Sequence, residues 1–275
     1  LSLSQDVQGE IYEYPEEFFK ERVHVIRRPR PDDFQIKEAA EKIKNSINPI
    51  LISGGGVFYS DAMDDLSNFA TKHNIPVTQT VMGYSTMKRD HSHFVGPIGG
   101  LGGKAANNLA KKTDLAIAVG TKLADFTTGS WANFENPNFS LVNINVSRFD
   151  ANKHMARSVI GDAKVTLQEL SNALGNWKAS NDWYDLSRKE LNSWNEYVDK
   201  ESGPTNQELP SYAHAVGAIY RNADPTDIAV TAAGGLVGEV VQVWRPKELN
   251  THETEWGFSC MSYEISGALG IKMAN

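Results

Sequence analysis

A glycine turn is the first feature of this sequence whose residue types and spacing could support chemistry. Ser53-Gly54-Gly55-Gly56 follows the apolar run 49–52, where a strand would lead into a helix. Glycines at such a turn allow a phosphate to approach the N–H groups that begin a helix. The dinucleotide-binding fingerprint needs a third glycine three residues after the second, and Tyr59 occupies that position. We therefore favour a purely structural turn and keep a phosphate site as the alternative.

Histidine and cysteine offer little further chemistry. His91 and His93 have the His-x-His spacing of some zinc sites, but the segment contains no cysteine ligand and no glutamate base. We therefore expect them to be solvated loop residues. The remaining histidines, His154 among them, are scattered, and spacing alone assembles no Ser-His-acid triad. Cys260 is the only cysteine, which excludes a disulfide within the chain and fits a reducing compartment.

Composition narrows the classes of function. The chain has 275 residues, 40% of them hydrophobic and 22% charged, as is typical of a globular protein with a sizeable core. Its net charge is −7, and no stripe of lysine and arginine could neutralise a phosphate backbone. No stretch approaches the roughly 18 apolar residues of a membrane span, and no signal peptide is recognisable. We expect no nucleic-acid partner, no membrane association and a cytoplasmic location.

Strands and helices alternate along most of the chain. Helical periodicity at 33–44, 62–72, 104–111 and 165–174 is interleaved with apolar runs at 49–52, 77–80, 115–119 and 141–146. This alternation predicts βαβ units, a parallel sheet and helices on both of its faces. A long helix at 183–200 ends before Gly203-Pro204, and a helix, a strand at 228–230 and a turn at Gly234-Gly235 follow. The predicted fold class is α/β, with a central Rossmann-like, doubly wound sheet and an incomplete second α/β unit.

The two ends of the sequence differ from this pattern. Leu1 to Ser4 alternate like a strand, and an acidic, aromatic segment and a proline-rich turn follow up to residue 31. Residues 265–275 have helical spacing with no glycine or proline to end it, although Asn275 could cap it. We expect the chain to be a piece of a longer protein.

The run 93–129 carries a family resemblance. It contains a glycine loop, an Ala-Asn helix, Thr113-Asp114-Leu115 at the start of a strand, and Val119-Gly120 followed by an aspartate and Thr128-Gly129. This order is similar to the central domain of acetolactate-synthase-like thiamine-diphosphate enzymes. Thr113 stands for the usual Ala, and Lys122 for the usual Arg. The strand 143–146 has Asn in place of the family's Asp, which removes carboxylates that could hold a ribose and argues against a bound flavin or adenine nucleotide.

Both flanks agree with this resemblance. Residues 3–8 resemble the last strand and exit of the family's pyrimidine-binding domain. Residues 231–236 resemble the beginning of its diphosphate-binding domain, and 257–269 resemble a helix start in that domain. The resemblance implies an end of the pyrimidine-binding domain and linker at 1–31, a central domain at 32–175, a helical linker at 176–208, and a truncated diphosphate-binding domain at 209–275.

Longer strings point to one branch of the family. Residues 5–10 with the following Tyr-x-Tyr-Pro, then Trp244-Arg245-Pro246, and then 250–261 resemble the C–C bond hydrolases of myo-inositol degradation. That resemblance implies thiamine-diphosphate-dependent cleavage of a small cyclic polyhydroxy diketone, opening its ring to 5-deoxyglucuronic acid. Val237 stands where the branch is expected to have Pro, and Ser262 where it is expected to have Gly.

The resemblance also implies which residues serve the site. Those expected near the cofactor are Ala233, Gly234, Gly235, Leu236, Ser259, Cys260 and Met261. His252, Glu253 and Glu255 could contact a polyhydroxylated substrate or be solvated loop residues. The catalytic Glu and the Mg²⁺ ligands of the parent are expected outside the chain, and its sites lie between subunits of a dimer or tetramer. We therefore expect this chain alone to be inactive, to contain no catalytic or metal-binding residue, and not to bind thiamine diphosphate tightly.

Two alternatives remain. One is a fragment of an acetolactate-synthase-like carboligase or decarboxylase, which residues 250–256 disfavour. The other is a stand-alone nucleotide-binding or structural module.

Overall fold

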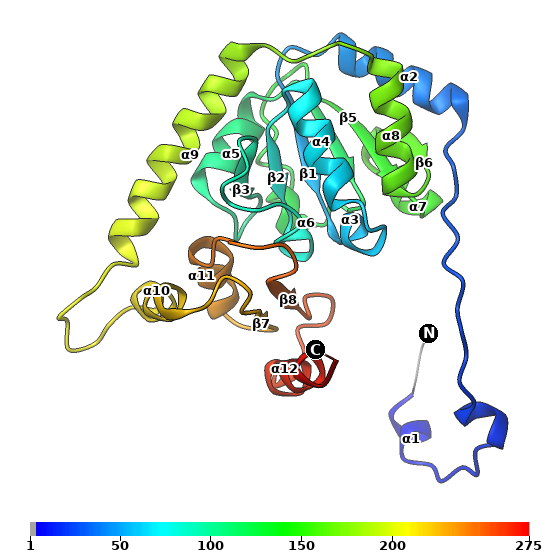
Figure 1. The fold of residues 1–275 in the computed structure, drawn as a ribbon, viewed down its shortest axis with the longest axis vertical. Coiled ribbons are helices and arrows are strands. Elements are labelled where there is room, and N and C mark those ends of the chain that lie inside the picture. Colours follow the sequence, from blue (N-terminus) through cyan, green and yellow to red (C-terminus); the bar gives the residue numbers. More distant parts are fainter. Residues whose placement is uncertain (1–3, 275) are drawn as a thin grey trace.

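The central unit is a six-stranded parallel sheet in the order β3-β2-β1-β4-β5-β6 (Figure 1). The structure is a computed structural model, and it describes residues 4–274. This strand order is that of a doubly wound sheet, which confirms the predicted fold class. The strands are β1 (Pro49–Ser53), β2 (Val77–Gln79), β3 (Phe94–Pro97), β4 (Leu115–Val119), β5 (Ser140–Asn145) and β6 (Arg157–Ile160).

The two middle strands, β1 and β4, are buried along their whole length. Leu51 pairs with Val77 of β2 on one side and with Ile117 of β4 on the other. A parallel strand with helices over both faces has no polar side, so its sequence is an unbroken apolar run. This is why periodicity located both strands.

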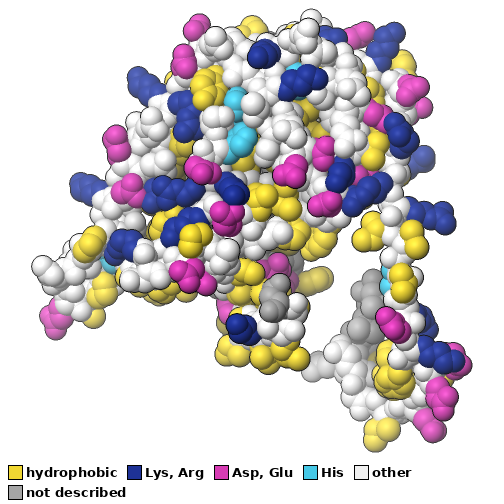
Figure 2. All heavy atoms as spheres, viewed as in Figure 1, with side chains coloured by type: hydrophobic (Ala, Val, Ile, Leu, Met, Phe, Trp, Pro, Cys, Tyr) yellow, Lys and Arg dark blue, Asp and Glu magenta, His cyan; other side chains and the backbone are white. Residues whose placement is uncertain are grey.

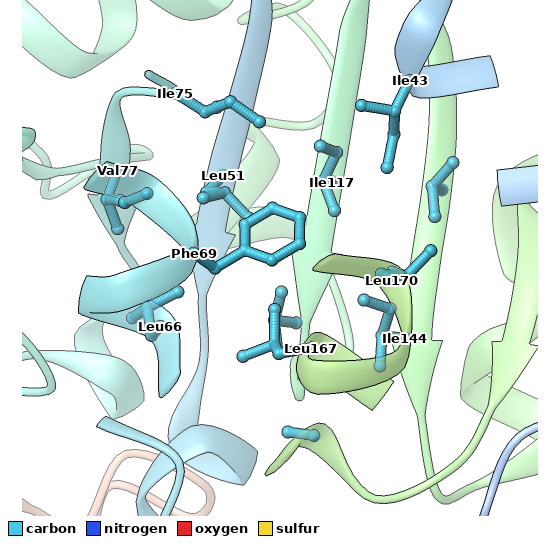
Figure 3. Packing of buried hydrophobic residues seen from close by; sticks show 14 of the residues in the cluster. Ile43, Leu51, Leu66, Phe69, Ile75, Val77, Ile117, Ile144, Leu167 and Leu170 are labelled. Atoms are coloured by element: carbon cyan, nitrogen blue, oxygen red, sulfur yellow. The ribbon is translucent and has the colours of Figure 1, made fainter. Parts of the chain in front are cut away.

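Helices cover both faces of the sheet. On one face, α2 (Asp33–Lys44), α4 (Met63–His73) and α8 (Ala163–Leu174) bury Phe69 and Leu167 against Leu51 and Ile117 (Figure 3). On the other face, α5 (Lys104–Lys112) and α9 (Asn181–Glu201) pack over the alternate side chains of the same strands.

Helix α9 is fastened to the central unit at its first turn. Ser180 caps the helix by accepting a hydrogen bond from the Trp183 N–H. Trp183 is buried, and its indole Nε1 donates to the Pro49 carbonyl oxygen at 2.7 Å. The helix then runs away from the sheet toward the second unit, as Figure 1 shows. It therefore couples the two units.

The second unit contains a two-stranded parallel sheet of β7 (Ala229–Thr231) and β8 (His252–Thr254). Its helices are α10 (Tyr212–Asn222), α11 (Leu236–Val243) and α12 (Tyr263–Ala274). Val237 and Val241 of α11 pack on Val81 of the central unit, and Arg245 pairs with Asp199 of α9. The unit is thus docked below the carboxyl ends of the central strands (Figure 1).

Helix α12 contacts β7 but buries none of its side chains. Ile265, Leu269 and Met273 are 77%, 60% and 79% exposed, and hydrophobic side chains gather at this end of the molecule (Figure 2). The two-stranded sheet of this unit leaves the apolar side chains of the helix uncovered.

Residues before 28 lie away from the core. Gln5–Gln8 form a short helix, α1, rather than continuing a strand, and the strand expected at 1–4 falls mostly outside the described residues. The chain reaches the central unit at Arg28, which pairs with Asp162 at 3.1 Å, and at Pro29, whose carbonyl accepts from the Asp162 N–H. The remaining short elements are η1 (Glu16–Phe19), α3 (Gly55–Tyr59), η2 (Val81–Gly83), α6 (Asp125–Thr128), α7 (Arg148–Ala151) and η3 (Lys153–Met155).

Candidate functional site

Both groups of predicted cofactor-binding residues follow the strands of the second unit. Residues 233–236 leave the carboxyl end of β7, and 259–261 belong to the loop that leaves the carboxyl end of β8. Because β7 and β8 are adjacent and parallel, both loops start from one edge of the sheet. Ala233 is half-buried, and the other six residues, Gly234, Gly235, Leu236, Ser259, Cys260 and Met261, are exposed. The carboxyl edge of parallel strands is where α/β proteins bind ligands.

The first loop leaves backbone groups open to an anion. Gly234 has φ +83°, and a Cβ atom added at Gly234 or Gly235 would meet nothing within 4 Å. Gly235 precedes α11, whose N-terminus receives no side-chain cap. The first N–H groups of a helix have no intrahelical acceptor and carry a partial positive charge. This turn therefore has room and donors for a diphosphate.

Glu255 organises the second loop. Its carboxylate accepts hydrogen bonds from the N–H groups of Phe258 at 2.8 Å and Cys260 at 2.6 Å, and its own N–H donates to the Thr231 carbonyl at 3.1 Å. The hydrogen bonds from Cys260 and Phe258 lower the pKa of Glu255. Glu255 thus shapes the loop that carries Ser259 and Met261, which the sequence alone did not indicate.

The surroundings of Cys260 disfavour its thiolate form. Partial desolvation and the neighbouring Glu255 raise the pKa of the Cys260 thiol. Thiolate is the nucleophilic form of cysteine, and a raised pKa disfavours it. Cys260 therefore contributes its small, weakly polar surface to the loop rather than a nucleophile.

Ser262 and Val237, the two positions that differ from the residues expected for the branch, have different consequences. Ser262 has φ +75°, a left-handed conformation that favours glycine. Val237 lies in the first turn of α11 and is 1% exposed, packed against Val81 and Val241. The serine carries a conformational cost, whereas the valine is part of the contact between the two units.

Replacing Ser262 with glycine should increase stability. Relief of the left-handed strain is worth about 1 kcal/mol, less the backbone entropy that glycine adds to the unfolded chain. The measurement is urea unfolding of wild type, Ser262→Gly and Ser266→Gly, the last lying within α12. We expect a higher midpoint for Ser262→Gly and a lower one for Ser266→Gly. A drop in the Ser262→Gly midpoint would show that the serine side chain supports the loop.

The glycines of the central sheet are explained by packing. The switch point of the sheet lies between β1 and β4, and there the Gly56 N–H donates to the Gly120 carbonyl at 2.9 Å. A Cβ atom at Gly54 would lie 2.4 Å from the Gly120 oxygen, and one at Gly56 would lie 2.6 Å from the Gly120 Cα. These contacts account for the turn at 53–56 without a phosphate.

The glycine loop before α5 is held by the asparagine of the Ala-Asn motif. Asn107 accepts from the Gly99 N–H and donates to the Gly99 carbonyl, both at 2.9 Å. Gly99 has φ +111°, and a Cβ there would strike the Phe126 carbonyl. In β5, Asn143 donates to the Asp150 carbonyl and Asn145 to that of Thr121. The asparagine side chains of these motifs therefore form hydrogen bonds with backbone groups of the chain itself.

The expectation that His93 is a solvated loop residue is wrong. His93 directly precedes β3 and is 5% exposed. Its Nε2 lies 3.1 Å from the Asn74 Oδ1, and its Nδ1 lies 2.9 Å from the Ser92 hydroxyl. His91 is half-buried and 3.3 Å from the Thr71 hydroxyl. Within residues 4–274, no group of three or more His, Cys, Asp or Glu side chains could hold a metal ion.

Two of the three residues expected to contact substrate lie within or beside the core of the second unit. His252 begins β8 and is 5% exposed, which contradicts a solvated loop position. Burial lowers its pKa to about 4. Glu253 is half-buried and accepts a long hydrogen bond, 3.4 Å, from the Tyr263 hydroxyl.

Buried histidines make stability depend on pH. Burial lowers the pKa of His93 and His252 to about 4 and also lowers that of His73. Their folded pKa values lie below the unfolded value near 6.5, so the unfolded chain binds more protons in between. The stabilisation that these neutral histidines provide is therefore complete above about pH 6.5 and is lost as the pH falls from there toward 4.

Urea unfolding at pH 7.5 and pH 5.0 measures this dependence, with each pKa unit worth about 1.4 kcal/mol. His252→Gln should reduce the slope between these pH values by up to one proton. His24→Gln, on the exposed segment, is the reference variant against which the change in slope is measured. A wild-type chain equally stable at both pH values would contradict the assignment.

Comparison with known proteins agrees with this architecture. Residues 36–170 match the family model described as the central domain of thiamine pyrophosphate enzymes. Residues 36–170 are therefore similar to the central domain of thiamine pyrophosphate enzymes.

Over its whole length the chain is similar to curated proteins named 3D-(3,5/4)-trihydroxycyclohexane-1,2-dione hydrolase. It is 40% identical to that of Clostridium tetani, 38% to that of Geobacillus thermodenitrificans and 37% to that of Bacillus licheniformis. The match covers 100% of this chain but 46%, 46% and 47% of these relatives, so the chain spans about half their length. The predicted resemblance to this branch of the family is confirmed. Within residues 4–274, no helix is long and apolar enough to cross a membrane.

Proposed function

We propose that this chain is part of a thiamine-diphosphate-dependent hydrolase that cleaves a C–C bond of trihydroxycyclohexane-1,2-dione and yields 5-deoxyglucuronic acid in myo-inositol degradation. The observation that carries the proposal is the common origin of the loops 233–236 and 259–261 at one parallel edge. Similarity to the named hydrolases along the whole chain supports the choice of substrate.

The residues present fit one side of the cofactor site. Gly234, Gly235 and Leu236 would hold the diphosphate through main-chain N–H groups at the uncapped start of α11. Ser259, Cys260 and Met261 would lie along the rings of the cofactor, in the loop that Glu255 shapes. Bound thiamine diphosphate supplies an electron sink for the cleaved C–C bond.

The remaining parts of the site would come from elsewhere in the parent. The activating Glu and the Mg²⁺ ligands are proposed to lie outside this chain, and the parent to be a homo-oligomer, a dimer or tetramer. The domain limits at 31, 175 and 208 are likewise proposals. A cytoplasmic location is proposed on the single cysteine. On this account the chain alone neither turns over substrate nor binds thiamine diphosphate tightly.

Product analysis tests the proposal. The chain extended to the length of its relatives, supplied with thiamine diphosphate and Mg²⁺, should convert the cyclic dione to a ring-opened acid and should not condense pyruvate. Formation of acetolactate from pyruvate would favour the carboligase alternative. A flavin or adenine absorbance in the purified protein would favour a nucleotide-binding module.

A further inference from the structure

A small crevice separates the second unit from the central sheet. It encloses about 70 Å³ and is lined on one side by residues of α3 and of the segment after β2, and on the other by β8. Its polar lining includes Tyr84, Thr254 and His252, and Tyr59 is at its rim with 75% of its surface exposed. The crevice exists only because the two units dock.

Two hydroxyl groups of this lining are buried and have no hydrogen-bond partner within the described chain. Tyr84 is 2% exposed and its Oη is unpaired, and Thr254 is 5% exposed and its Oγ1 is unpaired. Buried polar atoms in proteins nearly always have a partner. Both residues line the same crevice, which makes a polar molecule bound there the candidate partner of the two hydroxyls.

The lining also defines the chemistry of that molecule. Tyr84 lies edge-on to His252 with ring centroids 5.4 Å apart, and burial keeps this histidine neutral. The Glu253 carboxylate is the charged group of the lining, so an anion would be repelled. The crevice is small, and its two unpaired hydroxyls match a ligand that offers hydroxyl groups of its own. A pair of neighbouring, uncharged hydroxyl groups fits this lining.

We propose that this crevice binds two neighbouring hydroxyl groups of the polyhydroxylated ring on which the parent enzyme acts, with Tyr84 and Thr254 as the recognition residues. The inference rests on the proposed function and adds residues that the family resemblance did not supply. The location supports it, because Thr254 is the last residue of β8 and leads through Glu255 into the loop at 259–261. A ring held by its hydroxyl edge at this point is beside the proposed cofactor loops.

Isosteric variants of the full-length protein separate recognition from structure. Tyr84→Phe and Thr254→Val each remove one unpaired hydroxyl and little else. We expect the KM for the cyclic dione to rise about fivefold to tenfold in each variant, with kcat nearly unchanged. The melting temperature should be equal to or higher than that of wild type, because no protein hydrogen bond is lost.

Matched controls come from hydroxyls that are already bonded. The Tyr220 hydroxyl donates to the Arg245 carbonyl at 3.0 Å, and the Thr251 hydroxyl donates to the Glu248 carbonyl at 2.8 Å. Tyr220→Phe and Thr251→Val should lower the melting temperature and leave KM unchanged, the reverse of the pattern at Tyr84 and Thr254.

The outcomes are distinguishable. An unchanged KM in Tyr84→Phe and Thr254→Val, in a protein that turns over the dione, overturns the inference and leaves the proposed function intact. A lower melting temperature with unchanged KM also overturns it and shows that the hydroxyls bind structural water. Absence of dione turnover by wild type contradicts the proposed function itself, and the inference falls with it.

Discussion

Replacing Gly54 with alanine should destabilise the chain by about 3 kcal/mol, because the added methyl group has nowhere to go. Its Cβ would lie 2.4 Å from the Gly120 carbonyl oxygen and 2.5 Å from the Thr121 Cβ. Gly54 has φ −109°, which any residue adopts, so the cost is steric and not conformational. The turns after β1 and β4 would have to separate at the centre of the sheet.

Gly100→Ala is the matched control for this variant. Its Cβ would come no closer than 3.8 Å to any neighbour, so we expect a change within about 0.5 kcal/mol. Urea unfolding of the three proteins, followed by circular dichroism, measures the difference. If Gly54→Ala is as stable as Gly100→Ala, the turn has free space, and the phosphate alternative for residues 53–56 regains support.

Replacing Trp183 with alanine should cost about 4 kcal/mol. Trp183 is 3% exposed and joins the cluster between α5, α9 and the sheet, and its indole N–H satisfies the Pro49 carbonyl at the start of β1. Loss of the ring leaves a cavity and an unpaired carbonyl together. The second unit contacts the central sheet partly through α9, so it should loosen as well.

One further variant separates the apolar volume of the indole from its hydrogen bond, and another is a control on the same helix. Trp183→Phe keeps most of the apolar volume and loses the hydrogen bond, and we expect it to cost about half as much as alanine. Tyr197→Ala removes a 54% exposed ring from the same helix and should cost less than about 1 kcal/mol. Hydrogen exchange across α10 and α11 should rise in Trp183→Ala alone. Equal unfolding midpoints for Trp183→Ala and Tyr197→Ala would show that α9 does not stabilise the central unit.

The sequence predicted the helices that bury one face and the strands that are buried on both faces. Helices α2, α4, α5 and α8 and the strands β1 and β4 were located within one or two residues, because a periodic or unbroken apolar pattern follows directly from their packing. Strands β3, β6 and β8 were missed. They are three or four residues long, they contain Gly96, Arg157 and Glu253, and they are strands because β2, β5 and β7 pair with them.

The candidate site divides in the same way. Its two loops were predicted from motif resemblance, since each is a local string of residues. The burial of His93 and His252 was not predicted, because both depend on contacts with distant segments such as Asn74 and Tyr84. The crevice also escaped detection, since Tyr84 and Thr254 meet only when the second unit docks on the central sheet.

The central claim is that these residues form one side of a cofactor site that other segments complete. Calorimetric titration with thiamine diphosphate and Mg²⁺ tests it most directly, on this chain and on the chain extended to the length of its relatives. We expect saturable binding by the extended chain and none by this chain at the same concentrations. Tight binding by this chain alone would contradict the account, because the complete cofactor site would then lie within these 275 residues.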